Sequence, residues 1–201
     1  MSTKSGVDKW EPKQVTESPD FWSTFEPDEA VPRRVRKFLH RDEHLSTWGQ
    51  TTRYYAHAYA NAFERLVMEA ISIWPRSEYL RLPLFFLARH AAELHLKQVI
   101  QAYSATGEQP DATGHNLIVL WKKASKLVHV SAADEWSGHV GRLIQHLHEF
   151  DPDGQRFRYP GDVVGTPFDG TRVELERLAQ THGSITLWCE GACDMLDASP
   201  E

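Results

Sequence analysis

Residues 82–103 read LPLFFLARHAAELHLKQVIQAY, and they predict the central element of the fold. Apolar residues recur at three- and four-residue intervals on two sides of this stretch, which is the period of an α-helix. Pro83 is compatible with the first turn, because a proline there loses no intrahelical hydrogen bond. A helix that is apolar on two sides packs against neighbours on both, so this helix is expected at the centre of its domain.

Polar side chains interrupt this apolar background. Burying such groups without partners costs several kcal/mol or changes their protonation state. They are therefore expected either to pair with one another or to face a cleft. The residues concerned are Arg89, His90, Glu93, His95 and Lys97.

Helical periodicity extends well beyond this stretch. Residues 46–73 are predicted to form a long amphipathic helix, because apolar residues recur at helical intervals up to Pro75. A third helix is predicted in GHNLIVLWKKASKLV, at residues 114–128. No segment shows a convincing two-residue period of a β-strand.

Two candidate capping boxes precede the last two predicted helices. Ser131 stands before Asp134, and Thr171 before Glu174, each at the spacing at which the two side chains cap a helix start. Residues 151–170 contain four glycines and three prolines and cannot form a regular helix. The chain is therefore predicted to be all-α, an antiparallel bundle of about five main helices with one long irregular loop.

The composition suits one compact domain with an extended arm. The chain has 201 residues, of which 41% are hydrophobic and 25% are charged, as in ordinary globular proteins. Residues 1–32 are acidic, carry scattered aromatic side chains and lack helical period, so they are expected to form an N-terminal arm. This arm either wraps the helical domain, residues 33–201, or docks on a protein partner.

Charge and hydropathy exclude other classes. A net charge of -6 argues against a protein that coats nucleic acid through charge alone. The basic cluster at residues 33–41 is either the solvated face of a short helix or a local phosphate-binding site. No apolar run approaches the roughly 18–20 residues of a membrane span, and the chain begins with a polar segment. We therefore expect a cytoplasmic protein without membrane association. Cys189 and Cys193 are too few for a disulfide framework.

The spacing of His90 and His95 argues against a zinc site on one helix. An inverted zincin signature has the order HxxEH, but here one extra residue separates Glu93 from His95. At about 100° per residue, the two imidazoles diverge by about 140° around the helix axis. They cannot chelate one ion as a pair four residues apart does. Neither a metal nor a cofactor is expected.

The same residues have the inventory for metal-free phosphodiester cleavage. Cleaving RNA without a metal requires a base, an acid and a cation that stabilises the charge on phosphorus. Histidine supplies the first two near neutral pH, and arginine grips phosphate with its planar fork. Arg89 with His90 and His95 supplies these groups on the central helix, and Arg142 with His146 and His148 repeats the pattern on the fourth helix.

Other polar residues have both a structural and a functional interpretation. Glu93 and Lys97 stand four residues apart and form a simple ion pair or a part of a larger network. His115 either caps the helix that follows it or takes part in chemistry. Three loop residues either hold the loop onto acidic helix faces or line an anionic pocket. They are Arg156, Arg158 and Tyr159.

Three segments, AELHLK, GHNLIVLW and FDPDGQRFRYPGD, resemble the HEPN-like helical proteins of bacteria. In that family a helix carrying ExxLK is followed by a GH-x-L-x-x-L turn and helix, and the similarity spans residues 82–162. Many members are metal-independent ribonucleases of toxin–antitoxin or phage-defence systems. Their arginine–histidine motif is paired across a homodimer. The resemblance implies that Arg89 binds phosphate, that His95 is the acid or base, and that His90 is an orienting or second proton-transfer group.

Some HEPN-like members lack activity and serve as binding or assembly modules. The resemblance therefore leaves two hypotheses. In the first, the chain is a ribonuclease. In the second, it is a non-catalytic module that acts through protein or nucleotide partners. Its contact surfaces would then be the N-terminal arm and the loop at residues 156–159.

Overall fold

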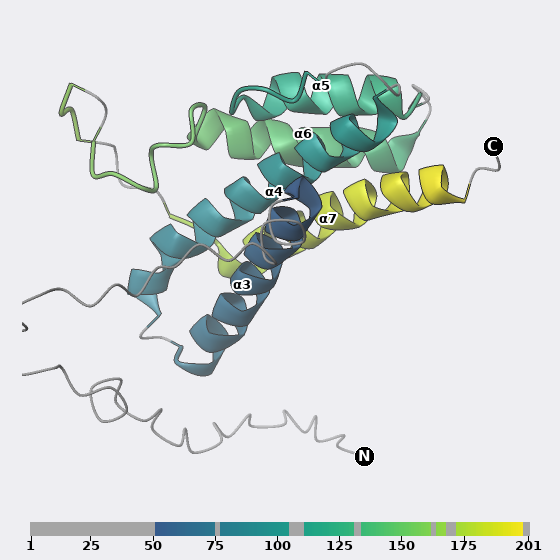
Figure 1. Ribbon diagram of the computed structural model, residues 1–201. Coiled ribbons are helices and arrows are strands. Elements are labelled where there is room, and N and C mark those ends of the chain that lie inside the picture. Colours follow the sequence, from purple (N-terminus) through teal and green to yellow (C-terminus); the bar gives the residue numbers. More distant parts are fainter. Residues whose placement is uncertain are drawn as a thin grey trace, which may run out of the picture. The chain divides into compact units, whose positions relative to one another are not determined.

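The computed structural model describes residues 51–74, 77–104, 111–130, 134–161, 164–167 and 172–198. These ranges contain five α-helices and one short 3-10 helix (Figure 1). Within them there is no β-strand, and one isolated antiparallel bridge joins Gly161 to Pro167. The prediction of an all-α helical bundle is confirmed. The predicted arm, residues 1–32, and the basic cluster at residues 33–41 lie outside the described residues.

The central helix lies where it was predicted. α4 begins one residue before the predicted start and ends at the predicted residue, Tyr103. A short helix, η1, immediately precedes it. The elements are α3 (Thr52–Ser72), η1 (Glu78–Leu80), α4 (Arg81–Tyr103), α5 (Leu117–Leu127), α6 (Glu135–Phe150) and α7 (Leu175–Asp197).

Side-chain caps fix the starts of α3 and α5. The Thr51 hydroxyl accepts a hydrogen bond from the backbone N–H of Tyr54, at 3.1 Å. The Asn116 side-chain oxygen accepts one from the N–H of Val119, at 3.0 Å. Each bond satisfies a donor that the first helical turn would otherwise leave without a partner. The cap of α5 therefore belongs to Asn116 and not to its neighbour His115.

The last two helices begin later than their predicted capping boxes indicate. Asp134 is itself the N-cap of α6, and its carboxylate accepts hydrogen bonds from the N–H groups of Trp136 and Ser137. Glu174 is the N-cap position of α7 but makes no side-chain cap bond. Both boxes were therefore placed one turn too early. For α6 the reason is that the carboxylate of Asp134 caps the helix alone. Ser131 and Thr171, the first residues of the two boxes, lie outside the described residues.

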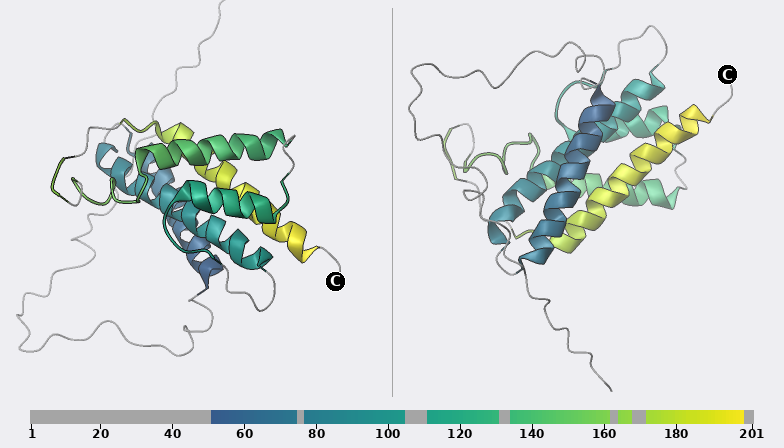
Figure 2. Two further views of the ribbon diagram at one scale, coloured as in Figure 1. Left: turned by 90° about the horizontal axis from the view of Figure 1, so that it is seen from above. Right: turned by 60° about the horizontal axis from the view of Figure 1, so that its bottom comes forward.

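α4 is the helix around which the others pack. It contacts α3 and η1, and also α5 and α7, while α6 contacts α5 and α7 (Figures 1 and 2). All described helices belong to one compact unit, Asp42–Glu201. The core side chains on α4 are Leu84, Phe85, Ala88, Ala91, Ala92, Leu96, Val99 and Ile100.

The described helices are not of the membrane-spanning kind. None of them combines sufficient length with sufficient apolar character to cross a lipid bilayer.

Candidate functional site

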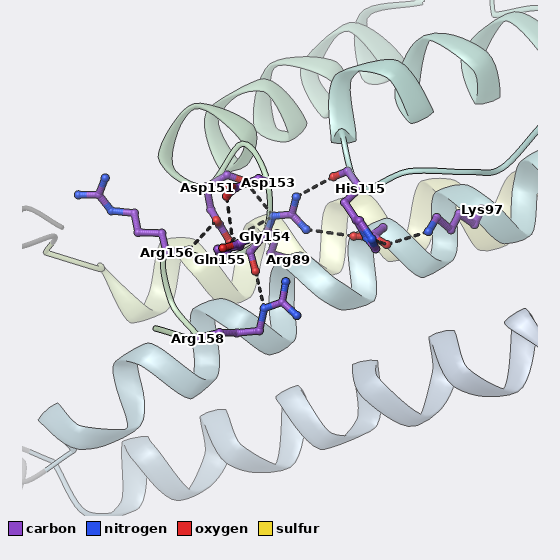
Figure 3. A network of polar contacts seen from close by, with 10 residues as sticks. Arg89, Lys97, His115, Asp151, Asp153, Gly154, Gln155, Arg156 and Arg158 are labelled. Atoms are coloured by element: carbon purple, nitrogen blue, oxygen red, sulfur yellow. Dashed lines mark hydrogen bonds and ion pairs between the residues drawn. The ribbon is translucent and has the colours of Figure 1, made fainter. Parts of the chain in front are cut away.

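Arg89 lies at the centre of a buried polar network (Figure 3). Its Nε–H donates to the backbone carbonyl of Asp151 at 3.0 Å, Nη1 donates to Glu93 Oε2 at 3.1 Å, and Nη2 donates to the carbonyl of His115 at 2.7 Å. The residue is only 2% exposed. Arg89 therefore joins α4 to the segment before α5 and to the loop after α6.

The loop after α6 fits closely over Arg89. Asp151 is fully buried; its carboxylate lies 3.3 Å from Arg89 Nε and accepts a hydrogen bond from the N–H of Arg156. Gly154 has a left-handed φ of +76°, and a methyl group there would lie 3.0 Å from Arg89 Nη1. Only glycine adopts this conformation without strain and leaves room for the guanidinium. The backbone of the loop is thus held against α4.

Glu93 is the buried carboxylate of the network and has three partners. Besides Arg89, it accepts hydrogen bonds from Lys97 Nζ at 2.8 Å and from His115 Nδ1 at 2.9 Å. Burial raises the pKa of Glu93, but the hydrogen bonds and charges of Lys97 and His115 outweigh burial and leave the pKa below its ordinary value. The predicted pair of Glu93 and Lys97 is therefore part of a larger buried network.

His115 is the accessible member of this network. Its side chain is 65% exposed, although the carboxylate that it contacts is buried. A carboxylate only accepts hydrogen bonds, so Nδ1 carries the proton in this contact. The contact fixes the orientation of an imidazole that solvent can reach.

His90 occupies an aromatic setting on α4. Its ring is half-buried, lies edge-on to Tyr59 with 4.4 Å between centroids, and stacks on Phe86 at 5.6 Å. Burial lowers the pKa of His90; Glu93 opposes this, whereas Arg158 and Arg89 reinforce it. His90 is therefore a neutral imidazole near neutral pH.

His95 is directed to a different part of the fold from Arg89. It is 0% exposed, its Nδ1 lies 2.9 Å from the carbonyl of Ala91, and its ring lies 5.7 Å from that of His57 on α3. Burial lowers its pKa. The structure thus does not bring Arg89 and His95 together in one solvent-reachable site within the chain. The reason is geometric, because Arg89 reaches toward the loops of α5 and α6 while His95 reaches toward α3 and α7.

Arg142 and His146 do not form a common site either. Arg142 lines a groove between α5 and α6, whereas His146 lines another groove between α6 and the start of α7. His146 Nδ1 lies 4.0 Å from Glu149 on the same helix, and its ring lies edge-on to Phe150. The repeated arginine–histidine pattern of α6 therefore spreads over two grooves.

The loop at residues 151–161 has a buried base and an exposed end. Phe157 is buried and stacks on Phe85 with 3.8 Å between ring centroids. Arg158 donates from Nε to the carbonyl of Gly154, and its guanidinium lies 5.5 Å from the ring centroid of Phe86. Tyr159 is 57% exposed. The loop is thus held by the packing of Phe157, while Arg158 contacts a backbone carbonyl and an aromatic ring and not an acidic helix face.

Figure 3 also shows the direction of Arg156 relative to this loop. Its backbone N–H is bound by Asp151, while its side chain extends away from Arg89. The guanidinium of Arg156 is therefore not a part of the buried network around Arg89.

Sequence reasoning missed residues that only the folded chain brings close. Asp151 was predicted only as the start of a loop, yet it meets Arg89 across 62 positions of sequence. His57 and Glu190, which lie beside His95, belong to two other helices, α3 and α7. No local spacing connects these residues, so no periodicity or motif could have paired them.

Comparisons of the chain with protein-family models, with curated proteins and with solved structures find no match. The resemblance to HEPN-like proteins therefore stays a prediction. Function is inferred below from the geometry of the site.

Proposed function

We propose that this chain is a non-catalytic, HEPN-like binding module that contacts single-stranded RNA through the loop after α6. The observation that carries the proposal is the burial of Arg89, whose three nitrogens all have partners within the protein. A phosphate would have to displace these partners and reach a side chain sealed from solvent. Arg89 in this setting stabilises the bundle, because breaking a buried charge pair is costly.

The exposed end of the loop supplies the contact surface. Arg158 is exposed beside the ring of Phe86, and Tyr159 follows it. Proteins that bind single-stranded nucleic acid combine cationic groups for the phosphates with aromatic rings on which bases stack. Asp151 and Phe157 hold the base of this loop, so less conformational entropy is lost on binding.

Fluorescence anisotropy with a labelled oligouridine at low ionic strength tests this proposal. Tyr159→Ala is expected to weaken binding by about tenfold, because stacking a base on an aromatic ring contributes about 1–3 kcal/mol. Arg158→Ala is expected to weaken binding to a similar extent, because it removes a cation that neutralises a phosphate. Two α3 variants are the controls. Arg65→Ala removes an exposed arginine, and Tyr54→Ala removes a tyrosine that is also 57% exposed. Absence of saturable binding by the wild type, or equal weakening by the controls, would contradict the proposal.

A second candidate function is metal-independent cleavage of RNA, in a defence or toxin–antitoxin setting as the family resemblance implies. The observation that favours it is the pair of Glu93 and His115, in which a buried carboxylate orients an exposed imidazole. A carboxylate that accepts from one ring nitrogen sets the tautomer and leaves the other nitrogen available for proton transfer. Lys97, bound to the same carboxylate, brings a cation beside this pair.

Incubation of total RNA with the protein in EDTA separates the two functions. If the ribonuclease hypothesis is right, wild type cleaves RNA and His115→Ala loses the activity, while the exposed α6 variant His139→Ala keeps it. Light scattering of the active sample then tests the homodimer that the resemblance implies. No cleavage at micromolar protein, or equal cleavage by His115→Ala, excludes this second function.

A further inference from the structure

A second cluster of polar groups joins three helices on the side of α4 that His95 occupies. His57 comes from α3, His95 from α4 and Glu190 from α7. Glu190 Oε1 lies 3.7 Å from His57 Nδ1 and 4.0 Å from His95 Nε2. Three ligand atoms, one from each residue, lie within 4.8 Å of one another.

His95 presents an unpaired acceptor to this cluster. Its Nδ1 contacts the carbonyl of Ala91, and because a carbonyl only accepts, the proton of the neutral ring lies on Nδ1. Nε2 then carries a lone pair, yet it is buried and has no hydrogen-bond partner among the described residues. A buried polar atom without a partner is costly and calls for an explanation. A backbone carbonyl behind one ring nitrogen is also the arrangement that fixes metal-binding histidines.

The other two groups give the cluster access to solvent. The side chains of His57 and Glu190 are each nearly half-exposed, whereas His95 is buried. An ion could therefore enter from the side of α3 and α7 and reach Nε2 of His95. One coordination position would remain open to water on the exposed side.

We propose that His57 Nδ1, His95 Nε2 and Glu190 Oε1 form a binding site for Zn²⁺, with water as the fourth ligand. Two imidazoles and one carboxylate are a known ligand set for zinc with an open position. Bonds of about 2.0–2.1 Å place tetrahedral ligand atoms about 3.4 Å apart. The observed 3.7 Å and 4.0 Å are slightly longer, and rotation of the exposed side chains of His57 and Glu190 shortens them.

The bound ion would satisfy Nε2 of His95 and connect α3, α4 and α7. This site is independent of RNA binding or cleavage, because none of its ligands belongs to the loop after α6 or to the network of Arg89. It also differs from the single-helix zinc site that the sequence argues against. That site would pair His95 with His90, whereas here the partners of His95 come from other helices.

Titration of the metal-free protein with ZnCl₂, followed by calorimetry, tests the site. Wild type is expected to bind one equivalent in the micromolar range or tighter. His57→Ala and Glu190→Gln are each expected to weaken this binding by at least tenfold. Both residues are partly exposed, so circular dichroism is expected to show an unchanged helical content. The control is His146→Ala, which removes an exposed histidine that also lies 4.0 Å from a glutamate but has no third ligand within the described part of the chain.

Thermal unfolding provides a second readout. An ion that binds only the folded state raises the melting temperature, so Zn²⁺ is expected to stabilise wild type and His146→Ala but not His57→Ala. The proposal is overturned if wild type binds no ion saturably in the micromolar range. It is overturned equally if His57→Ala and Glu190→Gln retain wild-type affinity, or if His146→Ala loses as much affinity as they do.

Discussion

At the scale of single residues, Arg89 is the side chain that joins three segments of the described structure. It holds a carboxylate of α4, a carbonyl before α5 and the loop after α6 at the same time. Arginine suits this position because its guanidinium is always charged and presents several donors in a rigid plane. The same properties suit phosphate binding, so burial and partners, and not residue type, distinguish the two roles here.

Arg89→Met is expected to lower the free energy of unfolding by about 3–5 kcal/mol, because it removes the cation beside the buried carboxylate of Asp151 and one of the three partners of the buried carboxylate of Glu93. Urea unfolding followed by circular dichroism measures this loss. Arg65→Met is the control, since Arg65 is exposed and bonds only within α3 among the contacts described. Equal stability of the two variants would show that the network contributes little.

Among the elements, α5 is the shortest α-helix in the described ranges, and it has a side-chain cap. It is only 11 residues long, and helices of this length are marginal without packing and capping. Its N-cap, Asn116, follows His115, whose carbonyl accepts from Arg89 and whose ring contacts Glu93. The start of α5 therefore positions the exposed imidazole of the candidate site.

Asn116→Ala is expected to cost about 1 kcal/mol of unfolding free energy, because the N–H of Val119 loses its acceptor. Chemical denaturation measures the change. Asn61→Ala, in the interior of α3, makes the same substitution where no cap is lost, and alanine's higher helix propensity makes it nearly neutral. A neutral effect of Asn116→Ala would mean that water replaces the cap.

Gly154→Ala tests the fit between the loop and α4. We expect the variant to lose stability, because alanine is strained at the left-handed φ and its methyl group would press on Arg89. Gly165→Ala is the matched control, since Gly165 also has a left-handed φ, but among the described residues no atom would lie within 4 Å of a methyl group there. A larger loss of melting temperature for Gly154→Ala than for Gly165→Ala isolates the contact with Arg89.

At the scale of the whole molecule, buried histidines make folding sensitive to acid. Burial lowers the pKa of His90, His148 and His182, and that of His182 falls from 6.5 to about 4. The folded state therefore binds fewer protons than the unfolded state below the ordinary histidine pKa. The contribution of these histidines to the free energy of unfolding is fully present above about pH 6.5, and it decreases as the pH falls toward their lowered pKa values.

For His182, the loss of unfolding free energy between pH 7 and pH 4 is expected to reach roughly 2–3 kcal/mol. The ring is buried against Phe63; His95 disfavours its protonation further, and Glu64 lies 3.9 Å from Nε2. Unfolding free energies of wild type and His182→Leu, measured across this range, test the expectation. The variant is expected to show the weaker dependence on pH, and parallel curves would rule out His182 as a contributor.

The helices were predictable because their period is local. A stripe of apolar residues at three- and four-residue intervals depends only on neighbours in sequence, and this placed α4 within one residue at its start. The predicted helix starts were less accurate. Local spacing suggested a capping box that begins at Ser131, but Asp134 caps α6 alone. The turn-rich composition of residues 151–161 likewise indicated a loop from sequence alone.

The roles of the polar residues were settled by packing between distant segments. The local sequence does not show whether Arg89 faces solvent or Asp151, because the contact joins residues 62 positions apart. His95 meets His57 and Glu190 only because α3 and α7 both pack on α4. Burial and partner choice are properties of the assembled core, so residue types and local spacing are not sufficient to assign them.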